Sequence, residues 1–223
     1  MSPSPGAAPT TWWTWRVSDL QCAARVFVAR HGEADYESEL LSDAGGWLTP
    51  LGRDQAGVLA ASVSGERIAR VWTSDMARAV QTGEIVAAQL GTDVIVRTGL
   101  REFGVGDAAG TTGDPDPFAE TFAAWLDGDL AARIPGGESG TEVVERYAAV
   151  LDEIADSHRG ESVLVISHGG VMCMALSALA RNLTLSHSRD LPVPHCEVVA
   201  VEADADGWVA RSWAGRPITW NDR

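Results

Sequence analysis

The sequence predicts an α/β fold, a three-layer sandwich whose mostly parallel central sheet has helices on both faces and ends in an antiparallel hairpin. Short β-rich apolar runs alternate with amphipathic helical segments between residue 25 and about residue 181. That alternation is typical of a parallel sheet covered on both faces. Near the end of the chain, two more apolar runs flank the residues DADG (204–207), which favour a tight turn between antiparallel strands.

The individual elements follow from local patterns along the chain. Strands are expected at the apolar runs 25–29, 68–73, 93–97, 162–166, 196–202 and 208–213. Helices are expected between them, where apolar residues recur at helical spacing. Thr49 and Pro50 supply the cap and first-turn proline of a helix that runs to about residue 63. Ser74 is expected to cap the next helix, and Ser139 with Glu142 has capping-box spacing before a third.

The domain organisation follows from composition. Residues 1–24 are rich in Pro, Ser, Thr and Trp and are interpreted as an extension. Residues 25–223 are interpreted as one domain, in which the Gly- and Pro-punctuated segment 103–138 forms a cap insertion. The apolar run 163–180 contains the interruption SHGG, so we interpret it as a strand, a loop and a helix and not as a membrane span.

The charge balance excludes some classes of partner. The chain has 31 acidic and 17 basic residues and a formal net charge of −14, which argues against nucleic acid or an anionic membrane as the partner. Every basic residue is arginine, so a Schiff-base or P-loop lysine is excluded.

The cysteines and the start of the chain predict a cytoplasmic location. Cys22, Cys173 and Cys196 lie far apart, without metal-ligand spacing or a disulfide framework. Residues 1–24 lack the basic start and continuous apolar run of a secretory signal. A reducing compartment is the simpler interpretation.

Two predicted strands end alike. The segments RVFVARHGE (25–33) and SVLVISHGG (162–170) each consist of an apolar run, one spacer residue and His-Gly. Ligands of parallel sheets bind beyond the carboxyl ends of the strands, and neighbouring strands lie about 4.8 Å apart. If these strands are neighbours, His31 and His168 lie side by side at that edge.

Charged residues are expected at the same edge. Arg30 ends the first strand, and Arg78 lies in the first turn of the helix after the second strand. Two guanidinium groups, two imidazoles and a helix N-terminus suit a phosphoryl group. Glu102 follows the third strand, and a carboxyl near phosphate is suited to general acid catalysis when protonated. Each residue alone is most often structural, so their convergence favours a site.

Six sequence blocks extend this pattern. They are RHGE (30–33), LTPLGRDQA (48–56), TSDMARAVQT (73–82), LREFGVGDAAG (100–110), GGES (136–139) and SHGG (167–170). In this order they resemble the histidine phosphatase superfamily, with its phosphoglycerate-mutase-like fold, over roughly residues 25–215. The resemblance implies hydrolysis of a small-molecule phosphomonoester.

The resemblance also implies a role for each site residue. His31 would be the nucleophile and would form a phosphohistidine, while Glu102 would protonate the leaving oxygen and then activate water. The groups implied to hold the phosphate are Arg30, His31, Arg78, His168 and Gly169. The arginines and histidines of this set would supply the charge that a metal ion provides elsewhere, so no metal and no cofactor is implied.

Departures from the family pattern leave alternatives open. The family often has threonine after RHGE and asparagine three residues later, where this chain has Ala34 and Glu37. Glu37 would bring negative charge near an anion, which weakens the first alternative, a bisphosphoglycerate-dependent phosphoglycerate mutase. The second alternative is a non-catalytic phosphate-binding module. Tyr36, Glu37 and Arg101 are expected to line the substrate pocket.

Other side chains have more than one interpretation. Aromatic residues near the predicted site either face the cleft or form the core of the cap; they are Tyr36, Trp47, Phe103, Phe118, Phe122 and Trp125. His187 and His195 lie in a loop before the final strands and could approach the cleft. The tryptophans near both ends of the chain could form the surface of a homodimer; they are Trp12, Trp13, Trp15, Trp213 and Trp220.

Overall fold

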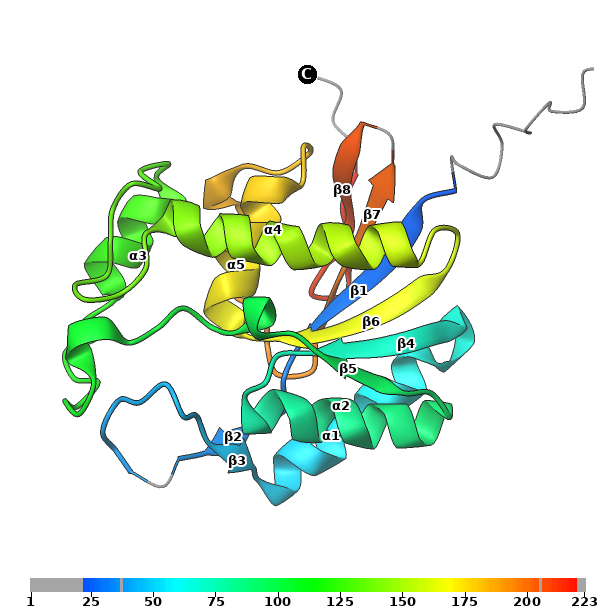
Figure 1. The fold of residues 1–223 in the computed structure, drawn as a ribbon, viewed down its shortest axis with the longest axis horizontal. Helices are drawn as coiled ribbons and strands as arrows, with labels where there is room; N and C mark the ends of the chain where they lie inside the picture. The colour runs from blue at the N-terminus through cyan, green and yellow to red at the C-terminus, as the bar shows by residue number, and fades with distance from the viewer. Residues whose placement is uncertain (1–21, 37, 205, 220–223) are drawn as a thin grey trace, which may run out of the picture.

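A seven-stranded sheet forms the centre of the protein. The computed structural model describes residues 22–36, 38–204 and 206–219 (Figure 1). The strand order is β5-β4-β6-β1-β7-β8-β9. The strands β5, β4, β6 and β1 are parallel to one another, and β7, β8 and β9 continue the sheet in antiparallel pairs. The predicted fold class, including the terminal hairpin, is confirmed.

The observed elements match most of the expected ranges. The strands of the sheet are β1 (Ala24–Arg30), β4 (Ile68–Thr73), β5 (Val94–Val96), β6 (Ser162–Ser167), β7 (Val198–Asp204), β8 (Gly207–Trp213) and β9 (Arg216–Pro217). The helices are α1 (Pro50–Val63), α2 (Ala77–Leu90), α3 (Ala119–Leu126), α4 (Gly140–Ser157) and α5 (Gly169–Leu179). Short 3-10 turns lie at η2 (Ser64–Glu66), η3 (Thr98–Leu100), η4 (Gly106–Ala108) and η5 (Leu185–Ser188). A separate pair, β2 (Ala34–Asp35) and β3 (Trp47–Leu48), was not expected, because two-residue strands carry no periodicity.

Helices cover both faces of the sheet. In Figure 1, α1 and α2 lie on one side of the strands, and α4 and α5 lie on the other. All of β6 is buried. Its Val163 and Val165 belong to the apolar cluster on the α4 and α5 side, whereas Leu164 and Ile166 belong to the cluster on the α1 and α2 side. Burial on both faces explains the continuous apolar run that the sequence shows here.

Two of the three expected helix caps are present. Thr49 Oγ1 accepts the N–H of Gly52 at 2.9 Å at the start of α1. Ser139 and Glu142 form the full capping box of α4. The third expectation was wrong, because α2 begins at Ala77 after Met76. The hydroxyl of Ser74 is hydrogen-bonded to His168 instead, at 2.7 Å.

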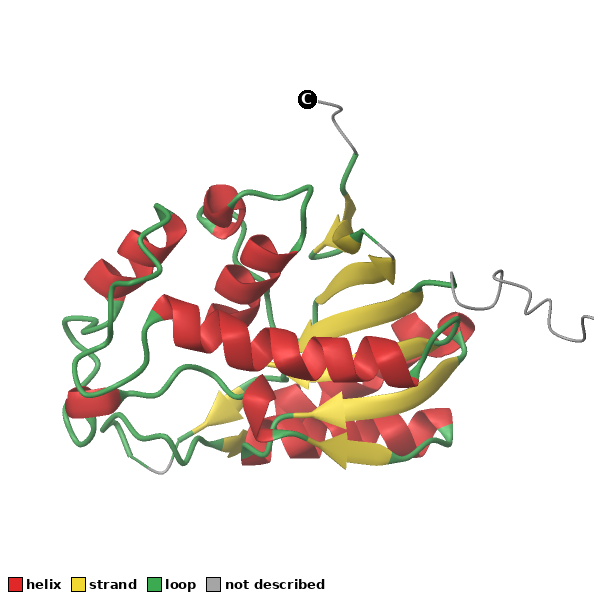
Figure 2. Cartoon of the chain, turned by 45° about the horizontal axis from the view of Figure 1, so that its top comes forward, coloured by secondary structure: helices red, strands yellow, loops and turns green. Residues whose placement is uncertain are grey.

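The segment 103–138 lies beyond the carboxyl ends of the parallel strands, where Figure 2 shows α3 apart from the sheet. Four of its aromatic rings pack on one another with centroids 5.5 to 6.2 Å apart; they are Phe103, Phe118, Phe122 and Trp125. These rings therefore form the core of this segment. Tyr36 and Trp47 lie outside it and are 58% and 52% exposed.

The long apolar run near residue 170 is a strand and a helix, β6 and α5, as expected. Within the described ranges, no helix has both the length and the apolar character needed to cross a bilayer. Glu37, Trp220 and the tryptophans of the N-terminal extension lie outside the described residues. Trp213 is described and is only 2% exposed, so, contrary to the expectation, it does not form part of a homodimer surface. The expectations for the extension and for a homodimer through the other tryptophans are still predictions.

Candidate active site

The ends of two neighbouring strands bring two histidines together. Strands β1 and β6 are parallel, with Arg30 opposite Ser167. A histidine directly follows each strand, and the ring centroids of His31 and His168 lie 5.1 Å apart. The two side chains are only 4% and 1% exposed. The sequence prediction that they lie side by side is confirmed.

The hydrogen bonds of His31 define its tautomer. Nδ1 lies 2.7 Å from the carbonyl oxygen of Gly32, to which it donates. Arg78 Nε donates to Nε2 at 3.0 Å, so Nε2 is the nitrogen that carries the lone pair. Burial, followed by the charge of Arg78, lowers the pKa of His31 to about 3. The imidazole is therefore neutral near pH 7, with its nucleophilic nitrogen facing Arg78.

Ser74 orients the second histidine. Its Oγ accepts the N–H of Met76 at 3.3 Å and lies 2.7 Å from His168 Nε2. Either atom can be the donor in this bond; with Ser74 as the donor, the proton of His168 lies on Nδ1. Burial, followed by the charge of Arg78, lowers the pKa of His168. Sequence reasoning assigned Ser74 to a helix cap, and no local pattern could have indicated a partner 94 residues away.

Three donors around His31 lack partners. Among the described residues, Arg30 Nε, Arg78 Nη1 and His168 Nδ1 are buried and make no hydrogen bond. Leaving such donors unpaired is costly, and their convergence suits a tetrahedral oxyanion. Arg30 is held in place by a 3.1 Å bond from Nη1 to the carbonyl of Val193.

Glycines make room for these guanidinium groups. A Cβ on Gly45 would lie 2.0 Å from Arg78 Nη1, and Gly45 has φ +70°, so this position requires glycine on both counts. A Cβ on Gly169 would lie 3.2 Å from Arg30 Nε. The chain thus passes close to both arginines without covering them with side chains.

The side chain of Glu102 lies against the N-terminus of α5. Its Oε2 accepts the N–H of Gly170 at 2.8 Å, and its Oε1 accepts the N–H of Val171 at 2.6 Å and of Phe103 at 3.2 Å. Burial raises the pKa of the carboxyl, against the lowering effect of these N–H groups and of Arg78. A carboxyl with a raised pKa, close to Arg78, is suited to exchange protons with a bound ester.

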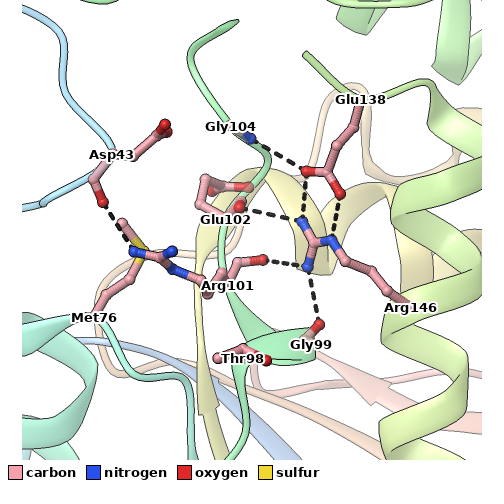
Figure 3. A pocket seen from close by; sticks show the side chains of 9 residues that line it. All are labelled: Asp43, Met76, Thr98, Gly99, Arg101, Glu102, Gly104, Glu138 and Arg146. Carbon is pink, nitrogen blue, oxygen red and sulfur yellow. Dashed lines mark hydrogen bonds and ion pairs between the residues drawn. The ribbon is translucent and has the colours of Figure 1, made fainter.

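A pocket of about 360 Å³ opens beside Glu102 (Figure 3). Its lining residues are Asp43, Met76, Thr98, Gly99, Arg101, Glu102, Gly104, Glu138 and Arg146. Arg101 pairs with Asp75 at 3.1 Å and donates to the carbonyl of Asp43 at 3.2 Å. Arg146 pairs with Glu138 at 2.6 Å. Both guanidinium groups of the pocket therefore already have carboxylate partners.

The residues expected in the substrate pocket have different outcomes. Arg101 lines the pocket. The ring of Tyr36 does not line it but lies 5.7 Å from the guanidinium carbon of Arg78, on the phosphoryl side of the site. Glu37 lies outside the described residues.

Of the two histidines whose role the sequence did not decide, one belongs to the site. The ring of His195 lies 5.6 Å from that of His31, whereas His187 packs 5.0 Å from Trp213. His195 reaches the site because β7 runs beside β1 and Cys196 N donates to Arg30 O at 2.9 Å. Its place thus depends on a strand pairing that the sequence alone does not specify.

No cluster of three or more His, Cys, Asp or Glu side chains in the described part of the chain could hold a metal ion. The charges that converge on His31 come instead from Arg30 and Arg78, which influence its pKa. The arrangement can hold a phosphoryl group against an imidazole nitrogen, with a carboxyl nearby.

Comparisons with known proteins identify the family. Residues 26–215 match the model of the histidine phosphatase superfamily (branch 1). The chain is 29% identical to a "Probable phosphoglycerate mutase GpmB" of Escherichia coli O1:K1, over 85% of this chain and 89% of that one. It is 30% identical to the same-named protein of Yersinia enterocolitica, with the same coverage. A mycobacterial glucosyl-3-phosphoglycerate phosphatase superposes with TM-score 0.71 at 26% identity, covering 86% of this chain and 99% of that one. The chain therefore belongs to the histidine phosphatase superfamily.

Proposed function

We propose that this protein hydrolyses a small-molecule phosphomonoester without a metal ion, through a phosphohistidine on His31. The observation that carries the proposal is the set of three unpaired, buried donors around a neutral imidazole. A phosphoryl group placed there would meet Arg30, Arg78 and His168 with its oxygens and His31 Nε2 with its phosphorus. The structural neighbours that are named phosphatases support the same reaction.

In the first step, Arg78 Nε gives up its hydrogen bond to His31 Nε2, and the lone pair of Nε2 forms a bond to phosphorus as the bond from phosphorus to the ester oxygen breaks. The Glu102 carboxyl gives its proton to that oxygen, and the alcohol leaves. The hydrogen bond from Nδ1 to Gly32 O stabilises the positive charge that develops on the ring. The donors of Arg30, Arg78 and His168 stabilise the charge on the phosphoryl oxygens.

In the second step, the Glu102 carboxylate takes a proton from water as the water oxygen attacks phosphorus. The bond from nitrogen to phosphorus breaks, which releases inorganic phosphate and restores neutral His31. The raised pKa of Glu102 supports both roles. A pKa closer to neutral pH lets the same carboxyl give a proton in the first step and take one in the second.

The name of the curated relatives favours a second candidate, a phosphoglycerate mutase. A mutase primed by a bisphosphorylated cofactor must bind a second phosphate away from the nucleophile. In the pocket beside Glu102, Arg101 is paired with Asp75 and Arg146 with Glu138. A second phosphate would have to compete with these carboxylates, so we favour hydrolysis.

The test is phosphate release from a panel of phosphomonoesters in excess chelator, for the wild type and His31→Ala. We expect release by the wild type and a loss of about 10⁴-fold or more in the variant, because alanine removes the nitrogen that forms the covalent intermediate. A phosphohistidine trapped by acid quench in the wild type alone would identify the intermediate.

Four outcomes would contradict the proposal. Equal turnover by His31→Ala would exclude the covalent route, and loss of activity in chelator would exclude metal independence. Transfer between phosphoglycerates that exceeds hydrolysis and needs a bisphosphorylated primer would establish the mutase. Inorganic phosphate binding without turnover of any ester would favour a binding module.

A further inference from the structure

Arg146 of α4 binds the backbone of the segment that carries Glu102. Its Nη1 donates to the carbonyl oxygens of Gly99 and Arg101, each at 2.9 Å, and its Nη2 donates to the carbonyl oxygen of Glu102 at 3.2 Å. Figure 3 shows the guanidinium pointing at these carbonyls from the α4 side of the pocket. One side chain thus satisfies three acceptors of an irregular segment.

Glu138 holds the other edge of the same guanidinium. Arg146 Nε donates to Glu138 Oε1 at 2.6 Å, and Nη2 donates to Oε2 at 3.1 Å. Glu138 Oε2 also accepts the N–H of Gly104 at 3.3 Å. The pair therefore binds the chain on both sides of Glu102. The two side chains are only 23% and 30% exposed, so water screens this bidentate pair less than a surface pair.

The segment around Glu102 needs such support. It follows the turn η3 and belongs to no helix or strand, so no regular ladder of hydrogen bonds fixes its backbone. A general acid must lie within hydrogen-bond reach of the atom it protonates, and misplacement by about 1 Å can lower a rate by about 10²-fold. The position of the carboxyl thus depends on contacts from other parts of the chain.

We propose that Arg146 and Glu138 are positioning residues that set the place of Glu102 relative to the leaving oxygen. This inference rests on the proposed function, in which Glu102 protonates that oxygen as the bond to phosphorus breaks. Neither residue touches the reacting atoms. Their effect reaches the reaction through the backbone of residues 99–104.

The effect must depend on the leaving group. An alkoxide is a poor leaving group and needs the proton of Glu102, whereas 4-nitrophenolate leaves readily without one. Misplacing the acid therefore lowers kcat/KM, which reports the first step, for alkyl phosphates and spares it for aryl phosphates. In the second step Glu102 acts as a base on an intermediate common to both esters, so a loss there lowers kcat for both. Damage to the fold or to the phosphoryl pocket would slow both.

The experiment compares Arg146→Lys and Glu138→Gln with the wild type on glycerol phosphate and on 4-nitrophenyl phosphate. Lysine keeps the charge but loses the planar fork. We expect kcat/KM on the alkyl substrate to fall about 10- to 100-fold and kcat/KM on the aryl substrate to fall less than about 3-fold. In Glu102→Gln, adding Arg146→Lys should cause no further loss on the alkyl substrate, since the two changes act on one proton transfer.

Arg133→Lys is the matched control. Arg133 makes a similar bidentate pair with Glu142 and also donates to a backbone carbonyl, that of Gly137, but it does not line the pocket. Equal loss of kcat/KM on both substrates in both variants, or full additivity with Glu102→Gln, would overturn the positioning role. If the wild type itself releases no phosphate in a His31-dependent way, the proposed function fails before this test begins. If Arg146→Lys does not fold, the Glu138→Gln result decides.

Discussion

The phosphoryl half and the leaving-group half of the site are built differently. On the phosphoryl side, His31 and His168 are 4% and 1% exposed and directly follow neighbouring strands. On the leaving-group side, Glu102 lies in an irregular segment beside an open pocket held by Arg146 and Glu138. The first half has a rigid main-chain frame, whereas the second depends on side-chain contacts between distant segments. We therefore expect changes in the first half to affect every ester and changes in the second to select among esters.

Replacing Arg78 with lysine tests whether changes in the phosphoryl half affect every ester. Arg78 donates from Nε to His31 and presents the unpaired Nη1 beside it. Lysine keeps the charge but cannot reproduce two donors in a plane. We expect kcat/KM to fall about 10²- to 10³-fold on alkyl and aryl phosphates alike. A loss confined to alkyl phosphates would show that Arg78 acts through Glu102, and the contrast between the halves would fail.

Acidification should destabilise the phosphoryl half. Between pH 6.5 and about 3 the unfolded chain protonates His31 while the folded chain keeps it neutral, so stability falls as the pH falls. At 1.36 kcal/mol per pKa unit, lowering the pH from 6.5, where the unfolded histidine is already half protonated, to 4.5 costs about 2 kcal/mol from this residue. His168 acts in the same direction. Glu102 opposes them, because its raised pKa makes protonation favour the folded state.

Urea unfolding at the two pH values measures this effect. The difference in unfolding free energy between pH 6.5 and 4.5 should be smaller in His31→Asn than in the wild type. All other titrating groups are shared, so the comparison isolates His31. An equal difference in the two proteins would show that His31 is not held neutral by the fold.

Two adjacent glycines face different halves of the site: Gly169 faces the phosphoryl half and Gly170 faces the leaving-group half. A Cβ on Gly169 would meet Arg30 Nε at 3.2 Å, and a Cβ on Gly170 would meet Phe103 Cε1 at 2.5 Å and Glu102 Oε1 at 2.9 Å. We expect Gly170→Ala to lower kcat/KM on alkyl phosphates about 10-fold and to spare kcat/KM on aryl phosphates. Gly169→Ala should instead weaken inhibition by inorganic phosphate to the same extent with either substrate. Identical profiles for the two variants would remove the distinction.

The smallest expected effect comes from the cap of α4. Ser139 Oγ accepts the N–H of Glu142 at 3.3 Å in the capping box. Ser139→Ala should lower the free energy of unfolding by about 1 kcal/mol. It should leave the ratio of alkyl to aryl turnover unchanged, because the contacts of Arg146 remain. A shift in that ratio like the one expected for Arg146→Lys would show that the start of α4, and not the ion pair, positions Glu102.

Local patterns predicted the phosphoryl half well. The apolar runs at 25–29 and 162–166, each followed by one spacer and His-Gly, predict two buried strands that end in histidine. Because parallel strands present their carboxyl ends at one edge, this pattern placed both histidines at that edge, and the pairing of β1 with β6 makes them neighbours. Arg78 follows from the same logic, as it lies in the first turn of α2 after β4.

Local patterns could not predict side-chain contacts across the chain. Ser74 has the residue type of a helix cap, and only the fold shows that its hydroxyl serves His168. His195 enters the site because β7 pairs with β1. The aromatic residues of 103–138 were compatible with a pocket or with a core, of which the core was favoured, and the ring contacts show a core.

The sequence by itself thus determined the sheet, its helical layers and the phosphoryl-binding edge, since strand and helix periodicity act over a few residues and place whole elements. Only the tertiary structure decided how Glu102 is held. Its carboxyl rests on the first N–H groups of α5, and its backbone is held by Arg146, a residue 44 positions away in the chain. Such contacts depend on how loops pack after the sheet has formed, and no periodicity in the sequence encodes that packing.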